Sequence, residues 1–426
     1  DNNKEGIYSQ KELIKKGKKL IENGNKEFIN AEINNEEMNI MLFTSGTTSK
    51  SKVVALSHKN ICSNLMDIAS VLDVNSEDTL LSFLPLHHVF ECTVGFLFSL
   101  YVGAQTVFCD GIRHIVENLN EYQVSVMACV PAIYERIFGM IRKKLEKEGK
   151  LQEILDNEEK YANVSMEEKK QIFKDIHNML GGKIKLFISG AAALDHQIEA
   201  KYRLLGLNLV QGYGLTETSP VIGVGSKKYY KTGSIGKAVP SVEVKIKNPN
   251  SEGVGELLAK GPSIMLGYYG DEKATREAFE EEWFNTGDLA RIDEEGYIFI
   301  CGRKKNVIVL KNGKNIYPEE MENLVNKIEG VNESFIFGKQ KTHDKDDIKI
   351  NVEIVFDREI MKEVYNATTE SKIQEVLLDK IKEINKAMPK YKAIRGMILT
   401  EKPLIKTTTN KIKRQENLNA IKEFEN

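Results

Sequence analysis

Four short, widely spaced segments of this chain carry residue types that nucleotide chemistry needs. Thr44-Ser45-Gly46-Thr47-Thr48 follows a short apolar run, and Lys52 lies just beyond it. Hydroxyls, backbone amides and a lysine in this order could surround phosphate oxygens. Glu217 could bind Mg²⁺, which prefers oxygen ligands, and the carboxylate of Asp288 could accept hydrogen bonds from a ribose. Lys411, in a threonine-rich run near the C-terminus, could stabilise charge on a phosphate that a carboxylic acid attacks.

Three of these four segments also have a plainer interpretation. A loop rich in Ser and Thr is often only a polar surface loop, and Thr286-Gly287-Asp288 is often only a turn. Lys411 has other lysines close to it in the sequence, such as Lys406 and Lys413. The chain has no GxxxxGK[ST] motif, which excludes the phosphate loop of P-loop NTPases. The predicted chemistry therefore requires all four segments to converge on one site.

Length and composition exclude several classes of protein. A chain of 426 residues is too long for one ordinary core, so two or three domains are expected. The net charge is −2, from 60 basic and 62 acidic residues, which gives no basic field for nucleic acid. The five cysteines are scattered without a CxxC pair, and a cytoplasmic location fits them best. No signal peptide or transmembrane segment is expected: the apolar stretch 92–108 is short for a membrane span and predicts a buried helix leading into a strand.

Apolar periodicity predicts an α/β fold. The predicted strands are 40–43, 79–84, 124–130, 183–188 and 207–210, and helical patterns cover 9–24 and 60–72. Residues 142–177 are rich in Lys and Glu, which favours a solvated helical excursion over a surface for a partner. Glycines and short alternating strands, such as 242–246 and 297–300, predict a β-rich subdomain over 234–304. A helix at 318–328, strands at 334–337 and 348–356, and a helix at 368–387 predict an α+β unit.

The predicted organisation has two domains. A large N-terminal domain covers 1–304, with mainly parallel sheets flanked by helices in its α/β part (1–233) and the β-rich subdomain over 234–304. A small α+β domain covers 305–426, a length within the normal range for a domain.

Five motifs, in this order, resemble the adenylate-forming superfamily of acyl-CoA synthetases, adenylation domains and luciferases. They are Phe43–Thr48 followed by Ser57-His58, then Gln211–Thr218, Trp283–Asp288, Gly302–Ile308 continuing through Gly313 to Ile316–Glu320, and Pro403–Arg414. The motifs span nearly the whole chain, although we expect the chain to lack the long segment that usually precedes the phosphate loop in this superfamily.

The resemblance implies a role for each residue of the site. Phosphates would be bound by Thr44, Ser45, Gly46, Thr47, Thr48 and Lys52; adenine by Gly190, Ala191, Ala192 and Tyr213, with Gln211, Gly212 and Gly214 around the nucleotide; the α-phosphate by Thr216; Mg²⁺ by Glu217; and ribose by Asp288 and Arg303. Catalysis would involve Lys411, Thr216, Glu217 and His88. His87, His88 and Val89 would line an acyl pocket, Lys305 would be the hinge of a mobile C-terminal lid domain, and Gly313 would face a coenzyme A tunnel.

Some of these residues also have structural interpretations. The trio at 190–192 could serve tight packing, Tyr213 could be a core residue, and a structural role is favoured for His87.

The form of three segments most resembles long-chain fatty-acid–CoA ligases: the excursion at 142–177, the run from His87 to Glu91, and the run from Thr407 to Arg414. The resemblance implies a fatty acid, ATP with Mg²⁺, and coenzyme A as reactants, no nucleic acid, and it leaves peripheral contact with a membrane open. Two alternatives remain: a fatty acyl-AMP ligase that loads a carrier protein, and a truncated chain that binds nucleotide without turnover.

Overall fold

The computed structural model describes residues 8–44, 52–341, 344–406 and 412–425, and the chain divides into two compact units, residues 1–37 and 38–426. The first unit contains the helix α1 (Gln10–Glu22). Ser9 begins α1 with a capping box, in which its hydroxyl accepts from the Glu12 amide and the Glu12 carboxylate accepts from the Ser9 amide. No side chain of α1 is buried, so the surface helix predicted over 9–24 is confirmed.

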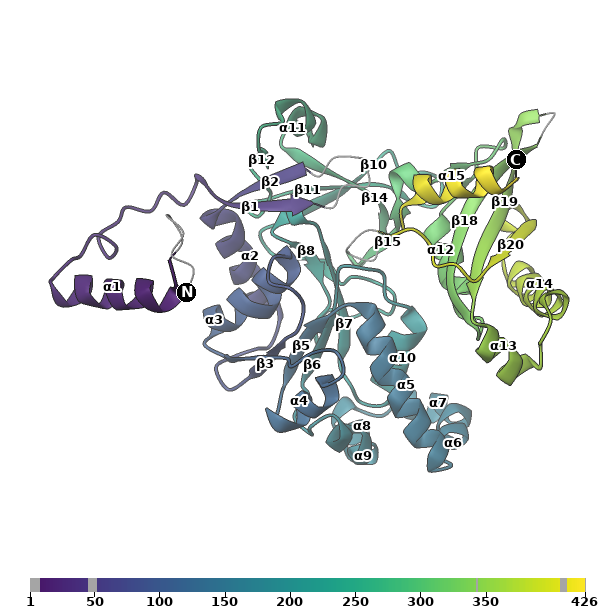
Figure 1. Ribbon diagram of the computed structural model, residues 1–426, viewed down its shortest axis with the longest axis horizontal. Helices are drawn as coiled ribbons and strands as arrows, with labels where there is room; N and C mark the ends of the chain where they lie inside the picture. The colour runs from purple at the N-terminus through teal and green to yellow at the C-terminus, as the bar shows by residue number, and fades with distance from the viewer. Residues whose placement is uncertain (1–7, 45–51, 342–343, 407–411, 426) are drawn as a thin grey trace. The chain divides into compact units, whose positions relative to one another are not determined.

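A seven-stranded sheet with the order β4-β3-β5-β6-β7-β8-β9 organises the second unit (Figure 1). Its strands are β3 (Thr79–Ser82), β4 (Gln105–Phe108), β5 (Val126–Cys129), β6 (Leu186–Ser189), β7 (Leu209–Gly214), β8 (Val221–Val224) and β9 (Lys237–Ala238). The pairs from β4 to β7 are parallel, whereas β8 and β9 pair in antiparallel fashion. The mainly parallel sheet predicted for this part of the chain is confirmed.

Helices cover both faces of this sheet. Successive residues of a strand point to opposite faces, and on β5 the side chain of Ala128 enters one buried cluster while its neighbour Met127 enters another. Buried residues of α2 (His58–Val71) belong to the first cluster, and those of α5 (Pro131–Lys147) belong to the second. A parallel sheet covered in this way is buried on both sides.

The connections between these strands contain further helices. They are the π-helical segment η1 (Glu91–Leu97), α3 (Phe98–Val102), α4 (Ile115–Glu121) and α10 (His196–Leu204). The stretch 92–108 is therefore a helix leading into a strand, as predicted. No helix within the described residues combines the length and the apolar character needed to cross a bilayer.

The charged segment 142–177 is helical, as predicted, but it is more than a solvated surface. After α5 it contains α6 (Leu151–Asp156), α7 (Glu158–Ala162), α8 (Met166–Ile172) and α9 (Lys174–Met179). Ile154, Tyr161, Phe173 and Ile176 are buried in the same cluster as α5. Most of the charged residues lie on the outer faces of these short helices. The apolar contact of the segment with α5 is therefore not evident from its composition.

Two antiparallel sheets lie beside the central sheet. One contains β1 (Met38–Thr44), β2 (Lys52–Ser57) and β12 (Gly267–Tyr268). The other contains β10 (Glu243–Lys247), β11 (Gly255–Lys260), β13 (Phe279–Glu280), β14 (Trp283–Ile292) and β15 (Ile298–Arg303), and α11 (Glu272–Ala278) lies between β12 and β13 in the chain. The segment 234–304 is rich in strands, but β12 pairs with β2 and so links this segment to the start of the unit.

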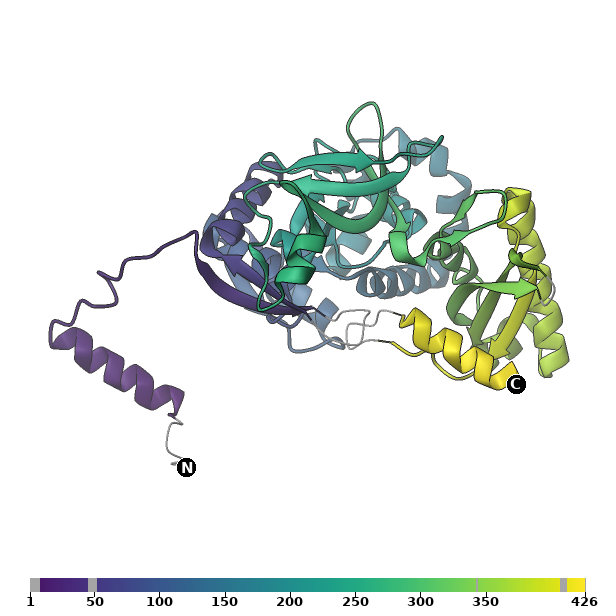
Figure 2. The ribbon, with the colours of Figure 1, turned by 90° about the horizontal axis from the view of Figure 1, so that it is seen from above.

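Beyond Arg303 the chain forms an α+β arrangement. Its elements are β16 (Ile308–Val309), β17 (Asn315–Ile316), α12 (Pro318–Val325), β18 (Val331–Lys341), β19 (Asp344–Phe356), α13 (Arg358–Tyr365), α14 (Glu370–Ala387), β20 (Gly396–Thr400) and α15 (Arg414–Glu425). Ile373, Leu377 and Ile381 of α14 pack on one face of the sheet β18-β19-β20, and Ile421 of α15 packs on the other. Figure 2 shows α15 and α14 on opposite sides of these strands. The domain boundaries at 233 and 304 stay predictions.

A tyrosine hydroxyl of α5 that contacts two strands of the central sheet provides a test of how the helix packs on the sheet. Tyr134 is fully buried, and its hydroxyl lies 2.8 Å from the carbonyl oxygen of Met127 on β5 and 3.0 Å from that of Ile188 on β6. Tyr134→Phe removes this donor and should lower the free energy of unfolding by about 1 kcal/mol, measured by urea titration. Tyr101→Phe, at a side chain that is 52% exposed, is the control and should leave the value unchanged. Equal stability of both variants would contradict the predicted contribution.

Candidate active site

The loops that carry most of the predicted site follow the carboxyl ends of neighbouring parallel strands. Residues 83–90 follow β3, residues 190–192 follow β6, and residues 215–217 follow β7. Since β3, β5, β6 and β7 are adjacent and parallel, these loops lie along the same edge of the sheet. In open α/β sheets, this edge is where ligands bind.

A tight turn after β7 presents Thr216 and Glu217. Gly214 is the last residue of the strand, and a Cβ atom there would lie 1.7 Å from the carbonyl oxygen of Pro220. The chain then enters a short 3₁₀ turn over residues 216–218. The Leu215 amide donates to the Thr218 hydroxyl over 2.9 Å and fixes the turn. Only glycine permits this close approach of two backbone segments, which explains the residue type at Gly214.

Glu217 is oriented by a tyrosine that the sequence analysis did not select. The Tyr268 hydroxyl donates to Glu217 Oε1 over 2.8 Å, and Lys52 Nζ lies 4.3 Å from the centre of the Tyr268 ring. Tyr268 is in β12 and Lys52 in β2, and the pairing of these strands brings Lys52 to the Tyr268 ring, while the Tyr268 hydroxyl reaches Glu217. Burial and the Glu217 carboxylate raise the pKa of Tyr268, which keeps it a hydrogen-bond donor. Its only sequence signal is a pair of tyrosines between two glycines, Gly267 and Gly270.

The surroundings of Glu217 suit a metal ion that is held mainly by a ligand. No group of three or more His, Cys, Asp or Glu side chains that could bind a metal exists among the described residues. Mg²⁺ is usually bound by one or two carboxylates together with phosphate oxygens and water. A single carboxylate, oriented by the Tyr268 hydroxyl, fits that arrangement.

A second cluster surrounds Asp288. This carboxylate is 5% exposed, and it accepts from the Tyr213 hydroxyl at Oδ2 over 2.6 Å and lies 3.0 Å from Arg303 Nε at Oδ1. Arg303 Nη1 also donates to the Thr286 carbonyl oxygen over 3.1 Å. Asp288 and Arg303 are paired residues of β14 and β15, so Thr286-Gly287-Asp288 belongs to a strand and is more than an isolated turn. Three of the predicted nucleotide-binding residues therefore meet here.

Tyr213 makes a polar contact in addition to its predicted stacking role. Enclosure of the side chain, and then the neighbouring Asp288 carboxylate, raise the pKa of the Tyr213 hydroxyl. The hydroxyl is therefore a fixed donor to Asp288, and stacking of its ring on adenine stays a prediction.

The small residues after β6 and the residues at the end of β7 are each held by a neighbour. A Cβ atom on Gly190 would lie 2.8 Å from Cζ of Phe90, and Ala191 has a φ angle of 66°. Gln211 Nε2 donates to Glu199 Oε2 on α10 over 3.0 Å. Glycine at 190 is thus required by the ring of Phe90, while contact of Ala191, Ala192 and Gly212 with adenine stays a prediction.

His87 and His88 lie in the loop between β3 and η1. Their ring centres are 4.2 Å apart, and the His88 amide donates to the Pro85 carbonyl oxygen over 3.0 Å. Val89, beside them, is buried. The rings are thus held next to each other at the carboxyl edge of the sheet, and their role in an acyl pocket stays a prediction.

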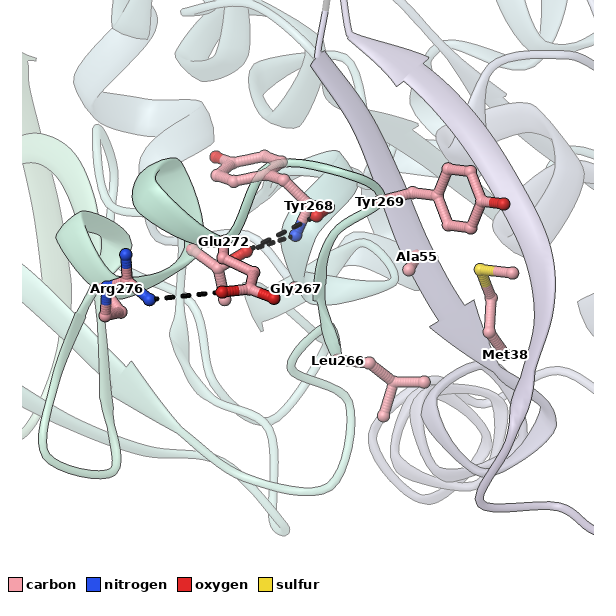
Figure 3. Close-up of a pocket in the computed structure, with 9 residues that line it drawn as sticks. Met38, Ala55, Leu266, Gly267, Tyr268, Tyr269, Glu272 and Arg276 are labelled. Carbon is pink, nitrogen blue, oxygen red and sulfur yellow. Dashed lines mark hydrogen bonds and ion pairs between the residues drawn. The ribbon is translucent and has the colours of Figure 1, made fainter.

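A separate open pocket of about 390 Å³ lies near the short strand β12 (Figure 3). It is lined by Met38, Ala55, Leu266, Gly267, Tyr268, Tyr269, Glu272, Thr275 and Arg276. The charged side chains in its wall, Glu272 and Arg276, pair with each other over 3.4 Å. None of the predicted acyl-pocket residues lines it, so we do not assign it to the acyl group.

Several predicted residues fall in other parts of the chain. Ser45, Gly46, Thr47, Thr48 and Lys411 lie outside the described residues. Thr44 is the last residue of β1, and its hydroxyl donates to the Lys52 carbonyl oxygen over 3.3 Å. Lys305 lies in a 3₁₀ turn over residues 304–306. Gly313 has a φ angle of 74° in the turn between β16 and β17, and no atom lies within 4 Å of a Cβ built there.

Comparison with known proteins agrees with this geometry. Residues 3–269 match the family described as AMP-binding enzyme, and residues 305–425 match the AMP-binding enzyme C-terminal domain. The chain belongs to the AMP-binding enzyme family, and the superfamily inferred from the motifs is confirmed.

The relatives with curated names are longer than this chain. Fatty acyl-CoA synthetase B of Dictyostelium discoideum is 31% identical over 354 residues, which cover 78% of this chain and 52% of the relative. Long chain acyl-CoA synthetase 6, peroxisomal, of Arabidopsis thaliana is 31% identical over 332 residues, which cover 71% of this chain and 46% of the relative. The chain thus spans about half the length of the curated relatives it matches.

Solved structures share the fold. ATP-bound MatB from Rhodopseudomonas palustris aligns with a TM-score of 0.70 at 23% identity. The alignment covers 92% of this chain and 70% of the MatB chain. O-succinylbenzoate coenzyme A synthetase from Bacillus subtilis, in complex with ATP and magnesium ion, aligns with a TM-score of 0.70 at 22% identity. The alignment covers 91% of this chain and 71% of the synthetase chain. The predicted fold class is therefore confirmed.

The Asp288 cluster predicts how the chain holds AMP. If Asp288 accepts both ribose hydroxyls, each bond to the charged acceptor contributes roughly 1.5–3 kcal/mol, and Asp288→Ala should weaken AMP binding accordingly. Tyr213→Phe removes only the hydroxyl that orients Asp288 and should have a smaller effect. Calorimetric titration with AMP measures both, after thermal unfolding has established that the variants are folded. Equal AMP affinity in Asp288→Ala and the wild type would remove Asp288 from the ribose site.

The contact between Tyr268 and Glu217 predicts a metal effect. Glu217→Gln keeps the size of the side chain and removes its charge, so ATP binding should require more Mg²⁺. Tyr268→Phe should shift the requirement in the same direction by less, because the carboxylate remains but loses its orienting donor. Tyr269→Phe, at the exposed neighbouring tyrosine, is the matched control. Calorimetry with ATP over a range of Mg²⁺ concentrations is the measurement, and an unchanged requirement in Glu217→Gln would leave Glu217 a structural role.

Proposed function

We propose that this chain carries the adenylate-forming machinery of a long-chain fatty-acid–CoA ligase. The observation that carries the proposal is the Asp288 cluster: a buried carboxylate fixed by Tyr213 and Arg303, which can accept the two hydroxyls of a ribose. The Glu217 site, the family membership and the names of the relatives support the same conclusion.

The proposed reaction has two steps. A carboxylate oxygen of the fatty acid first attacks the α-phosphorus of ATP, the bond to the bridging oxygen breaks, and pyrophosphate leaves. The sulfur of coenzyme A then attacks the carbonyl carbon of the acyl-adenylate, AMP leaves, and the thiol proton is released. No side chain has to act as a nucleophile, so positioning and charge stabilisation supply most of the rate.

The residues of the site have distinct tasks in this proposal. Asp288 binds the ribose, Arg303 holds Asp288, and Thr216 binds the α-phosphate. Lys52, with the residues of the 44–48 loop, binds the outer phosphates. When bound at Glu217, Mg²⁺ would neutralise part of the phosphate charge. Lys411 would stabilise the charge that develops during adenylation, and His88 would orient the acid. The proposed location is the cytoplasm, although two relatives are named as peroxisomal.

The two half-reactions can be measured separately. ATP–pyrophosphate exchange over a series of fatty acids of increasing length tests the first step, and we expect the highest rates with long chains. Thiol acceptors added after adenylate formation then distinguish coenzyme A from a carrier protein. Absence of exchange with every fatty acid would contradict the proposal and favour a nucleotide-binding chain without turnover.

The proposed role of Lys411 gives a sharper test. Lys411→Ala should lower the rate of adenylate formation by about 10²–10³-fold and spare thioester formation from preformed acyl-adenylate, because the lysine acts only in the first step. Lys413→Ala is the matched control, since Lys413 pairs with Glu416 over 2.9 Å and is given no catalytic role. Equal loss of rate in both half-reactions of Lys411→Ala would contradict a role for Lys411 in the first step alone.

A further inference from the structure

A buried carboxyl group joins the two ends of the loop that carries His87 and His88. The loop covers residues 83–90, between the last residue of β3, Ser82, and the first residue of η1, Glu91. The Ser82 hydroxyl donates to Glu91 Oε1 over 2.6 Å. The side chain of Glu91 therefore reaches back across the loop and closes it.

The site of Glu91 is built around its carboxyl group. Glu91 is completely buried, and within the described structure its Oε2 has no hydrogen-bond partner. A Cβ atom on Gly95 would lie 2.4 Å from Glu91 Oε1, so glycine at 95 leaves the space that the carboxyl group fills. Burial raises the pKa of Glu91, and the Ser82 hydroxyl together with the backbone of Leu84 and Phe83 offsets this only in part. A half-paired buried carboxyl group is costly for the fold.

The closed loop rests against the segment that follows β6. The ring of Phe90 packs on Gly190, where a Cβ atom would lie 2.8 Å from Phe90 Cζ. The ring centres of His87 and His88 are 4.2 Å apart. The His88 carbonyl oxygen accepts from the Cys92 amide over 2.9 Å, at the start of η1. The histidines are thus tied to the same short segment that Glu91 anchors.

We propose that Glu91 is a positioning residue, which fixes the loop 83–90 through Ser82 and thereby sets the place of His88. The consequence for catalysis rests on the proposed activation of a fatty acid, whereas the positioning itself is a property of the folded chain. Because a carboxyl group reaches Ser82 across the loop and a shorter side chain does not, loss of the carboxyl group frees one end of the loop.

The histidine ring resonances provide a test that needs no activity. The chain contains seven histidines, which can be labelled selectively and assigned by single replacement. In Glu91→Ala the resonances of His87 and His88 should shift or broaden, while those of the exposed His114 and His196 should remain in place. Ser82→Ala, which removes only the hydroxyl, should give the same pattern and serves if Glu91→Ala does not fold. Unchanged His87 and His88 resonances in the folded variants would overturn the proposal.

Two further variants separate positioning from general destabilisation. Ser125→Ala removes a hydroxyl that donates to the buried Asp78 over 2.8 Å at the opposite edge of the same sheet. It should lower stability without moving the His87 and His88 resonances. Glu91→Gln, which keeps the length and one acceptor oxygen, should restore most of the wild-type spectrum. A Ser125→Ala spectrum as strongly altered at these histidines as that of Ser82→Ala would contradict a local role for Glu91.

Steady-state kinetics then test the consequence for catalysis. A small displacement at a reacting centre can cost about 10²-fold in rate. In Ser82→Ala, kcat/KM for the fatty acid should therefore fall by up to about 10²-fold. The KM for ATP should stay close to the wild-type value. An equal loss for both substrates would contradict selective positioning of the acid. If the wild type shows no pyrophosphate exchange, the proposed function fails, and the histidine spectra still decide the role of Glu91.

Discussion

The parallel register of β3, β5, β6 and β7 is the constraint on which the candidate site depends. Each of these strands is buried on both faces, with alternate residues in two different cores. A slip of one residue would exchange the two sets of side chains, so the register is strongly specified. Because the strands are parallel and adjacent, the loops after Ser82, Ser189 and Gly214 are brought to one edge, although long stretches of sequence separate them.

Carboxyl groups at and around this edge each accept a hydrogen bond from a hydroxyl group. Tyr213 donates to Asp288, Tyr268 to Glu217, and Ser82 to Glu91. A hydroxyl group costs little to bury when it is hydrogen-bonded, and it restricts the carboxylate to one orientation. Asp288 has the additional cation Arg303, whereas burial raises the pKa of Glu91. The carboxylate paired with Arg303 thus belongs to the proposed ribose contact, and the buried Glu91 closes the loop.

The sequence predicts those parts of the fold and site that local patterns encode. The strand at 40–43 and the long helix at 368–387 were expected from periodicity, and the structure contains β1 and α14 there. Tyr268 could not be found in this way, because its position near Glu217 depends on pairing between Gly267 and Ala55, which are far apart in the chain. Glu91 was missed as a positioning group because it begins an apolar run, where its carboxyl group carries no periodic signal. The burial of the apolar residues of 142–177 is likewise not predicted, because charged residues surround them in the sequence.

Ion pairs lie on both sides of the predicted lysine loop. Lys406 pairs with Glu333 over 2.7 Å, and Arg414 pairs with the buried Glu322 over 2.6 Å. Removal of one partner from a buried ion pair is strongly destabilising, so the Arg414–Glu322 pair resists local rearrangement after residue 411, whereas the half-buried Lys406–Glu333 pair contributes less. Electrostatic catalysis requires a charge to be held close to its productive position. If Lys411 acts in only one step, the Arg414–Glu322 pair favours the predicted movement at Lys305 over a rearrangement next to the lysine loop.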